Sequence, residues 1–225
     1  MRDGPEDVYR SRRLRMVAEQ LRARGLADAR VLDAMSRVPR EAFVPRESAA
    51  RAYDDAPVAL ARGQTVSQPY MVAATLEHAC TRADDRLLDV GTGSGYAAAV
   101  ASLLVREVVS VERIPELADA ARARLARLGY ANVVVLTGDG SLGVPARAPF
   151  DVIVAAAAAP ALPAAWRAQL REGGRIVAPV GAPGAQRLVR ATLRGGRLDV
   201  ASLFDVRYVP LVGAQGFDED ADGRG

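Results

Sequence analysis

The chain has 225 residues, of which 50% are hydrophobic and 25% are charged, and its formal net charge is +3. These values fit one globular α/β domain with enough chain to bury a core, and they exclude collagen-like and disordered compositions. All 30 basic residues are arginine, which excludes Schiff-base and Walker lysines, and a single cysteine and a single histidine give no basis for a disulfide or a zinc site.

The first third of the chain is expected to form helices. Residues 1–9 lack an apolar pattern and are expected to be a loose tail, whereas apolar residues at helical spacing predict a helix over 10–24. Gly25 is expected to end that helix. Asp28 is a candidate N-cap for a second helix, which continues to about residue 38.

A long connection is expected next, over residues 53–68. It contains Pro57 and Gly63 and shows little periodicity. Long loops in compact domains are often functional, so this segment is a candidate part of the active site. Pro69 is expected to open a helix that runs to about Thr81.

The pattern then changes to strand, turn and helix. Residues 86–90 predict a short apolar strand, 91–95 a glycine-rich turn, and 96–104 an alanine-rich helix. Further strands are expected at 107–111, 133–136, 151–154, 175–180, 188–193, 198–204 and 208–211, and further helices at 115–128 and 166–170. Alternating strands and helices indicate an α/β fold with a doubly wound, mostly parallel sheet, whose ligands bind at the carboxyl ends of the strands.

The glycine-rich turn reads Gly91-Thr92-Gly93-Ser94-Gly95. Its glycines allow a tight turn and a close approach of backbone to a ligand, and the helix that follows presents free N–H groups. In a dinucleotide enzyme these groups would bind a pyrophosphate. Taken alone, the turn is equally well explained as a structural feature.

Its surroundings favour S-adenosylmethionine over NAD. The spacing of the glycines is G-x-G-x-G rather than G-x-G-x-x-G, and Asp89 places an anion just before the turn, which favours a ligand that carries a cation. Glu112 ends the next strand, about 20 residues beyond the turn, where a carboxylate can accept both ribose hydroxyls. Asp139 and Gly140 follow the third strand and are expected to contact the adenine.

Several longer segments resemble the protein-L-isoaspartate O-methyltransferases. They include Val38–Pro45, Ala52–Asp55, Gly63–Tyr70, Leu88–Tyr96, Gly138–Gly140, Phe150–Asp151, the alanine run that ends at Pro160, and Val209–Leu211. The resemblance runs from about Met16 to Gly213, and its specific part is Gly63–Tyr70, which other methyltransferases lack. It implies a Rossmann-like class I methyltransferase fold with an N-terminal helical extension.

The resemblance also assigns the substrate site. It implies that Ser67 is the active-site hydroxyl and that Thr65, Val66, Ser67 and Gln68 form a loop across the methyl donor and the substrate carboxylate. The local sequence alone favours a simpler role for Ser67 as a helix N-cap. The chain departs from the common family pattern at four alanines, which bear on cofactor contacts and substrate range: Ala59, Ala61, Ala97 and Ala156.

The implied reaction transfers a methyl group from S-adenosylmethionine to the free α-carboxylate of L-isoaspartyl residues in damaged proteins, which starts repair through a succinimide. Two alternatives remain open at this point. One is a related methyltransferase that acts on a normal Asp of a dedicated precursor peptide. The other is an RNA or small-molecule methyltransferase on the same fold.

One structural domain is expected, with three parts. Residues 1–80 form N-terminal helices and the substrate loop packed on the core, residues 81–213 form the S-adenosylmethionine-binding core, and the acidic residues 214–225 form a disordered tail. The arginines are scattered, so no nucleic-acid partner is expected. No apolar run is long enough for a membrane span and no signal peptide is recognised, so a cytoplasmic monomer without a metal is expected.

Overall fold

The computed structural model describes residues 5–218, and its centre is a seven-stranded sheet with the order β5-β4-β3-β6-β7-β8-β9. The strands from β5 to β7 are parallel, and β8 and β9 are antiparallel to their neighbours. The bounds are β3 Arg86–Val90, β4 Glu107–Glu112, β5 Val133–Thr137, β6 Phe150–Ala155, β7 Leu170–Val180, β8 Gln186–Arg194 and β9 Arg197–Val206. The predicted doubly wound, mostly parallel sheet is confirmed.

The direction of winding reverses at β3. From β3 the chain adds β4 and β5 on one side of the sheet, and it then returns to add β6 and β7 on the other side. The carboxyl ends of β3 and β6 therefore form a topological switch point, which is where open α/β sheets bind their ligands.

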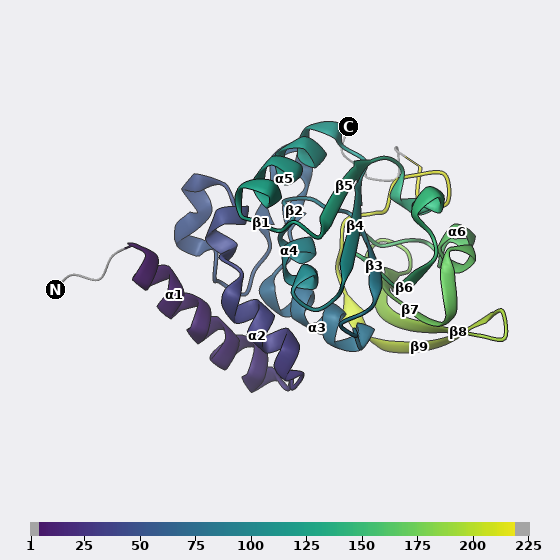
Figure 1. Ribbon diagram of the computed structural model, residues 1–225, viewed down its shortest axis with the longest axis horizontal. Helices are drawn as coiled ribbons and strands as arrows, with labels where there is room; N and C mark the ends of the chain where they lie inside the picture. Colours follow the sequence, from purple (N-terminus) through teal and green to yellow (C-terminus); the bar gives the residue numbers. More distant parts are fainter. Residues whose placement is uncertain (1–4, 219–225) are drawn as a thin grey trace.

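The helices cover the two faces of the sheet unequally. Their bounds are α1 Pro5–Arg15, α2 Ala29–Arg37, α3 Pro69–Ala79, α4 Tyr96–Ser102, α5 Pro115–Arg127 and α6 Ala164–Ala168. Figure 1 shows α3, α4 and α5 against one face with α1 and α2 outside them, and α6 on the other face. Within residues 5–218 no helix is long and apolar enough to cross a membrane.

Alternation along the strands divides the core into two layers. On β3, Leu87 belongs to the cluster beneath the N-terminal helices, and Leu88 belongs to the cluster on the opposite face. Met35 and Phe43 lie in the same cluster as Leu87 and are fully buried. The N-terminal helical extension thus shares its hydrophobic core with the sheet, as expected for a parallel sheet that is buried on both faces.

The helix boundaries follow local signals. Gly25 ends the first helical segment with φ of 92°, after a π-helix at Met16–Leu21 and a 3-10 turn at Arg22–Arg24. The Asp28 side chain accepts hydrogen bonds from the N–H groups of Arg30 and Val31, so the predicted N-cap is confirmed. The first helix was predicted to begin at residue 10 but begins at Pro5. Proline and two acidic residues in the first turn favour this start without any apolar pattern.

In three segments the observed structure differs from the structure that the sequence predicts. The 53–68 connection contains a small hairpin of β1 Val58–Ala59 and β2 Thr65–Val66. Residues 208–211 form no strand, because Pro210 cannot donate a ladder hydrogen bond and only an isolated bridge to Ala158 remains. Residues 214–218 of the expected tail carry backbone hydrogen bonds, such as that from Phe217 N to the Leu211 oxygen at 2.7 Å. Residues 219–225 lie outside the described part of the chain.

Candidate active site

The glycine-rich turn joins β3 to α4 at the switch point. Gly91 and Gly95 have φ of 93° and 88°, a region of backbone conformation that favours glycine. A Cβ on Gly95 would lie 3.2 Å from Leu125 Cδ1, so α5 packs directly against the turn. The N–H of Gly91 donates to the Val111 oxygen at 2.9 Å, which ties the turn to β4.

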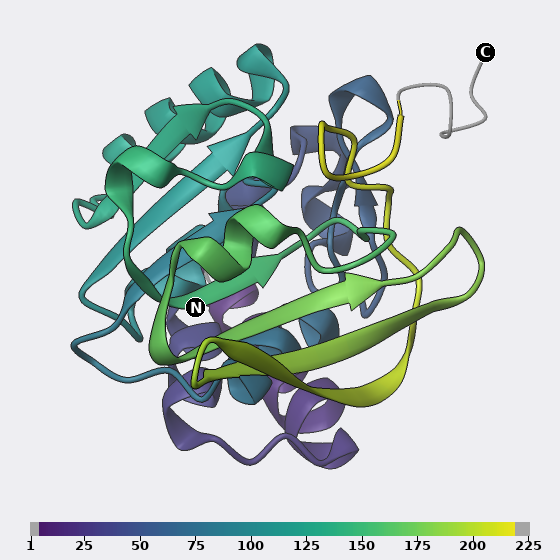
Figure 2. The ribbon, with the colours of Figure 1, turned by 90° about the vertical axis from the view of Figure 1, so that its right-hand side faces the viewer.

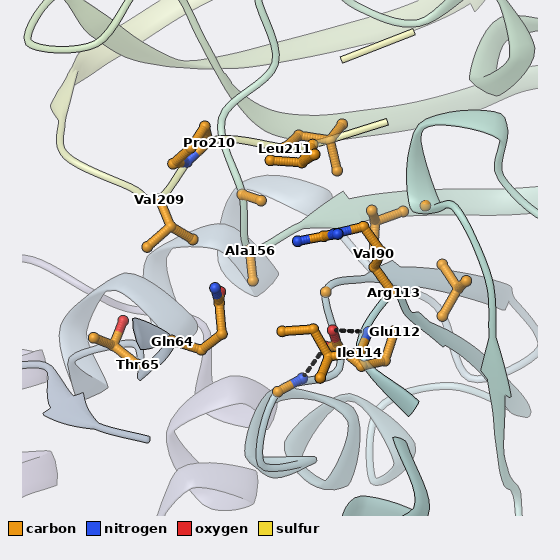
Figure 3. Close-up of a pocket in the computed structure, with 16 residues that line it drawn as sticks. Gln64, Thr65, Val90, Glu112, Arg113, Ile114, Ala156, Val209, Pro210 and Leu211 are labelled. Carbon is orange, nitrogen blue, oxygen red and sulfur yellow. Dashed lines mark hydrogen bonds between the residues drawn. The ribbon is translucent and has the colours of Figure 1, made fainter. Parts of the chain in front are cut away.

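A pocket opens above this turn, at the carboxyl ends of β3 and β4 (Figure 3). Gln64 lies directly before the Thr65–Gln68 segment, which we call the substrate loop. The side chains of Gln64 and Arg113 both point into the pocket. Its lining is glycine and apolar residues on most sides, apart from these two side chains, Thr65 and Glu112. The lining residues are Gln64, Thr65, Val90, Gly91, Gly93, Val111, Glu112, Arg113, Ile114, Gly140, Ala156, Ala157 and Val209–Val212. We call this cavity the donor pocket.

Glu112 supplies the carboxylate of the donor pocket and is only 7% exposed. Its two oxygens accept hydrogen bonds from Gly93 N at 2.9 Å and from Ile114 N at 3.0 Å (Figure 3). These bonds fix the carboxylate between the glycine turn and the loop after β4. A fixed carboxylate at the carboxyl end of β4, the strand that follows the glycine turn and α4, is suited to accept the hydroxyls of a ribose.

Asp89 lies behind the donor pocket rather than in its lining. It is 1% exposed and accepts a hydrogen bond from the Ser110 hydroxyl at 2.7 Å, and Ser110 in turn is hydrogen-bonded to the Thr92 hydroxyl. Its side chain faces a small adjoining cavity that Ser67 also lines. Burial raises the pKa of Asp89 to about 7, and the negative charge of Glu112 contributes to this increase. The hydrogen bond from Ser110 acts in the opposite direction.

The raised pKa of Asp89 predicts a pH-dependent stability of the ligand-free protein. The folded state binds the proton more tightly than the unfolded chain, whose pKa is near 3.8, so this contribution to stability is complete below about pH 4 and is lost as pH rises to about 7. Asp89→Asn removes the titration. The melting temperature of the variant relative to wild type is therefore expected to rise between pH 4 and 7 in scanning calorimetry. A difference that stays constant over this range would contradict the assignment.

Asp139 caps a short turn beside the donor pocket. One carboxylate oxygen accepts from Ser141 N at 2.8 Å and from Ser141 Oγ at 2.7 Å, and the other accepts from Ala214 N at 2.7 Å. Gly140 lines the donor pocket, but Asp139 does not. Trp166 Nε1 donates to the Gly140 oxygen at 2.9 Å and holds this edge in place. Contact of Asp139 with an adenine stays a prediction.

Ser67 lies between β2 and α3. The N-cap of α3 is Gln68, and no side-chain cap bond is made there, so the reading of Ser67 as a helix cap is wrong. Among residues 5–218 the Ser67 hydroxyl has no hydrogen-bond partner. It is partly exposed and lines three adjoining cavities around the substrate loop. The hydroxyl is thus available to a ligand.

An open cleft of about 600 Å³ lies on the outer side of Ser67. Figure 2 shows the yellow segment after β9 running toward the blue segment that holds the substrate loop. The cleft lies between these two segments and the β7–β8 connection. Its lining shares four residues with that of the donor pocket: Thr65, Ala156, Val209 and Pro210. The two cavities therefore meet at the substrate loop.

The structure brings most of the predicted site residues together. Thr65, Gly91, Gly93, Glu112 and Gly140 line the donor pocket, and Ser67 and Gln68 line the cleft. Val66, Thr92 and Ser94 line the cavity between them. Asp89 lies behind the turn, and Gly95 packs against α5.

Part of the donor pocket was not predicted from the sequence. Arg113, Ile114 and Val212 line it without having been singled out, and Gln64 was noted only as part of the Gly63–Tyr70 segment that resembles the family. Ile114 comes two residues after Glu112, the last residue of β4. Its position just past the end of that strand could have predicted that it lines the pocket. Val209–Leu211 was noted only for its resemblance to the family, and its position over the pocket depends on long-range contacts.

The fold and the paired cavities define a class I methyltransferase. The model of the family described as protein-L-isoaspartate(D-aspartate) O-methyltransferase matches residues 12–216. A protein-L-isoaspartate O-methyltransferase from Marinobacter nauticus is 52% identical over 96% of this chain and 99% of its own length. A relative from Methanoculleus marisnigri with the same name is 48% identical over 94% of this chain and 96% of its own length. This chain belongs to the protein-L-isoaspartate O-methyltransferase family.

Solved structures agree with this result. A protein-L-isoaspartate O-methyltransferase matches with a TM-score of 0.81 and 28% identity, over 92% of this chain and 67% of that one. A Plasmodium falciparum protein in complex with S-adenosyl-L-homocysteine matches with a TM-score of 0.77 and 26% identity, over 89% of this chain and 98% of that one.

Proposed function

We propose that this chain transfers a methyl group from S-adenosylmethionine to the free α-carboxylate of L-isoaspartyl residues in damaged proteins and peptides. The observation that carries the proposal is the position of the Thr65–Gln68 segment. It lies where the donor pocket meets an open cleft, and it presents the unpartnered hydroxyl of Ser67 there. Family membership over nearly the whole chain supports the same activity.

The residues of the donor pocket fit S-adenosylmethionine. Glu112 offers a fixed carboxylate, as ribose hydroxyls require, and Ile114, Val111 and Leu211 offer apolar surface for a flat base. The glycine turn leaves the backbone open to a close approach. Asp89 behind the turn would add a favourable potential for a cationic ligand when it is ionised.

The substrate needs little chemical activation. A carboxyl group with a pKa near 4 is ionised at pH 7, so no general base is required. When bound, S-adenosylmethionine would supply a methyl group on a sulfonium: the O–C bond would form as the S–C bond breaks, and the electron pair of that bond would stay on the sulfur of S-adenosylhomocysteine. Ser67 and the loop amides would orient the carboxylate, and Glu112 would hold the donor. Such alignment is worth roughly 7–11 kcal/mol.

A paired assay tests the proposal. Radiolabelled methyl transfer to an isoaspartyl peptide is compared with transfer to the same peptide with a normal Asp. We expect label in the isoaspartyl peptide only. Label in the normal peptide alone, or in RNA alone, would contradict the proposal and favour one of the alternatives.

We further propose that the protein acts as a cytoplasmic monomer. The large apolar side chains exposed on the described residues are scattered rather than gathered in a patch: Val8, Leu14, Leu103, Leu142 and Val200. One cysteine leaves no internal disulfide to maintain, which fits a reducing compartment. Sedimentation analysis that found a stable dimer would contradict the monomer.

A further inference from the structure

The cleft beside Ser67 has an outer part that the donor pocket does not share. The residues at the junction of the two cavities are Thr65, Ala156, Val209 and Pro210, as described above. The residues that line the cleft but none of the cavities around the glycine turn include Pro183, Gly184, Gln186 and Arg207. Arg207 and the β7–β8 connection therefore form a wall of the cleft that the donor pocket does not share.

Arg207 is the only charged side chain that lines the cleft among the residues that the structure describes. It is exposed, and within residues 5–218 it makes no ion pair and no side-chain hydrogen bond. A guanidinium keeps its charge at every working pH of the enzyme. The side chains that line the cleft are thus neutral apart from the guanidinium of Arg207, which is available to a ligand.

Nearby carboxylates are already engaged with other arginines. Asp205 lies two residues before Arg207 and pairs with Arg187 at 3.3 Å. On the side of the substrate loop, Asp55 pairs with Arg24. Neither anion pairs with Arg207, so among residues 5–218 its guanidinium is available to an acidic group that enters the cleft.

The backbone around Arg207 is held firmly. Gln186 is 5% exposed, and its side chain accepts from Tyr208 N at 2.6 Å and donates to the Tyr208 oxygen at 3.0 Å. One residue further, the Val209 oxygen accepts from Ala158 N at 2.8 Å. The guanidinium therefore projects from a fixed base, which reduces the entropy lost when it forms an ion pair.

We propose that Arg207 is a specificity-determining residue, which favours isoaspartyl sites with Asp or Glu close to the damaged residue. The inference rests on the proposed function, because a peptide that places its isoaspartyl carboxylate at Ser67 must run its flanking residues along the open cleft. An acidic flanking side chain pairs with Arg207, and a basic one is repelled by it. Because Arg207 lines the cleft and does not line the donor pocket, the effect is expected on substrate binding and not on methyl transfer.

Three peptides test the proposal, with Glu, Gln or Lys on both sides of an isoaspartyl-glycine pair. At low ionic strength we expect kcat/KM to be roughly two- to fivefold higher for the Glu peptide than for the Gln peptide, and lower for the Lys peptide by a similar factor. The differences are expected in KM, and they should shrink at 0.5–1 M salt, where the screening length is only a few ångströms. Arg207→Gln should remove the preference, and Arg207→Glu should reverse it.

Arg197→Gln is the matched control. It removes the same charge from the opposite end of β9, roughly 30 Å away, and is expected to keep the wild-type preference. Equal specificity constants of the wild type for all three peptides, or an unchanged preference in Arg207→Glu, would overturn the role of Arg207. The Gln peptide tests the proposed function separately. If the Gln peptide is methylated but the three peptides react equally well, only the role of Arg207 is rejected. If none of the three peptides is methylated, the proposed function is rejected as well.

Discussion

Replacement of Glu112 by alanine is expected to weaken the binding of S-adenosylmethionine and S-adenosylhomocysteine by about 1.5–3 kcal/mol, or roughly 10- to 150-fold in Kd. The carboxylate is 7% exposed and is already fixed by the N–H groups of Gly93 and Ile114. It can therefore accept ribose hydroxyls without being reorganised. The variant loses these charge-assisted bonds and also frees the glycine turn. Isothermal calorimetry with S-adenosylhomocysteine measures the change directly.

A second carboxylate on the same strand provides the control. Glu107 begins β4 at the opposite end and pairs with Arg86 at 2.8 Å, away from the donor pocket. Glu107→Ala is expected to lower stability slightly and to leave donor affinity unchanged. Glu112→Gln keeps the shape of the side chain and covers the case in which the alanine variant unfolds. Wild-type affinity in a folded Glu112→Gln variant would remove Glu112 from the donor site.

The local part of the site could be predicted because its signals are contained in short stretches of sequence. The turn at 91–95 follows a buried strand and precedes a helix, and this order alone places it at a strand end. Glu112 ends the next strand for the same reason. The Asp28 side chain caps its helix by accepting from Arg30 and Val31, which are its own neighbours in the chain.

The tertiary part could not be predicted in this way. Gln186 and Tyr208 are 22 residues apart, and neither periodicity nor composition indicates that an amide would clamp that backbone. Residues 208–211 look like a strand by their apolar content, but their position depends on Ala158, far away in sequence. The wall of the cleft and the cover of the donor pocket both depend on these contacts. They are a property of packing rather than of any local pattern.

For Asp89 the position along the chain could be predicted from the sequence, but the surroundings of its side chain could not. Its place before the glycine turn and its charge were evident from the sequence, and they led to the prediction of a ligand that carries a cation. The structure places its side chain behind the turn, where Ser110 donates to it and burial raises its pKa to about 7. Along β3 the side chains alternate between the two faces, so the side of the turn that Asp89 faces depends on strand register.

Ser67→Ala is expected to lower kcat on isoaspartyl peptides by roughly one to two decades, while donor affinity stays nearly unchanged. The hydroxyl lines the cleft and has no partner among the described residues, so a bond to the substrate carboxylate would be its main interaction. Loss of one hydrogen bond to a charged group costs about 1.5–3 kcal/mol, and each 1.36 kcal/mol of barrier is a factor of ten in rate. Single-turnover methyl transfer at saturating donor and peptide measures the step itself.

The melting temperature of the same variant separates orientation from structural support. Because Gln68 and not Ser67 is the N-cap of α3, Ser67→Ala should leave stability within about 0.5 kcal/mol of wild type, as is usual for exposed substitutions. Ser36→Ala, on α2 and outside every cavity of the site, is the matched control and should keep full turnover. A variant with wild-type kcat would remove Ser67 from the reaction. The backbone amides of residues 65–68 would then be the groups that orient the carboxylate, because they lie at the same junction of the donor pocket and the cleft.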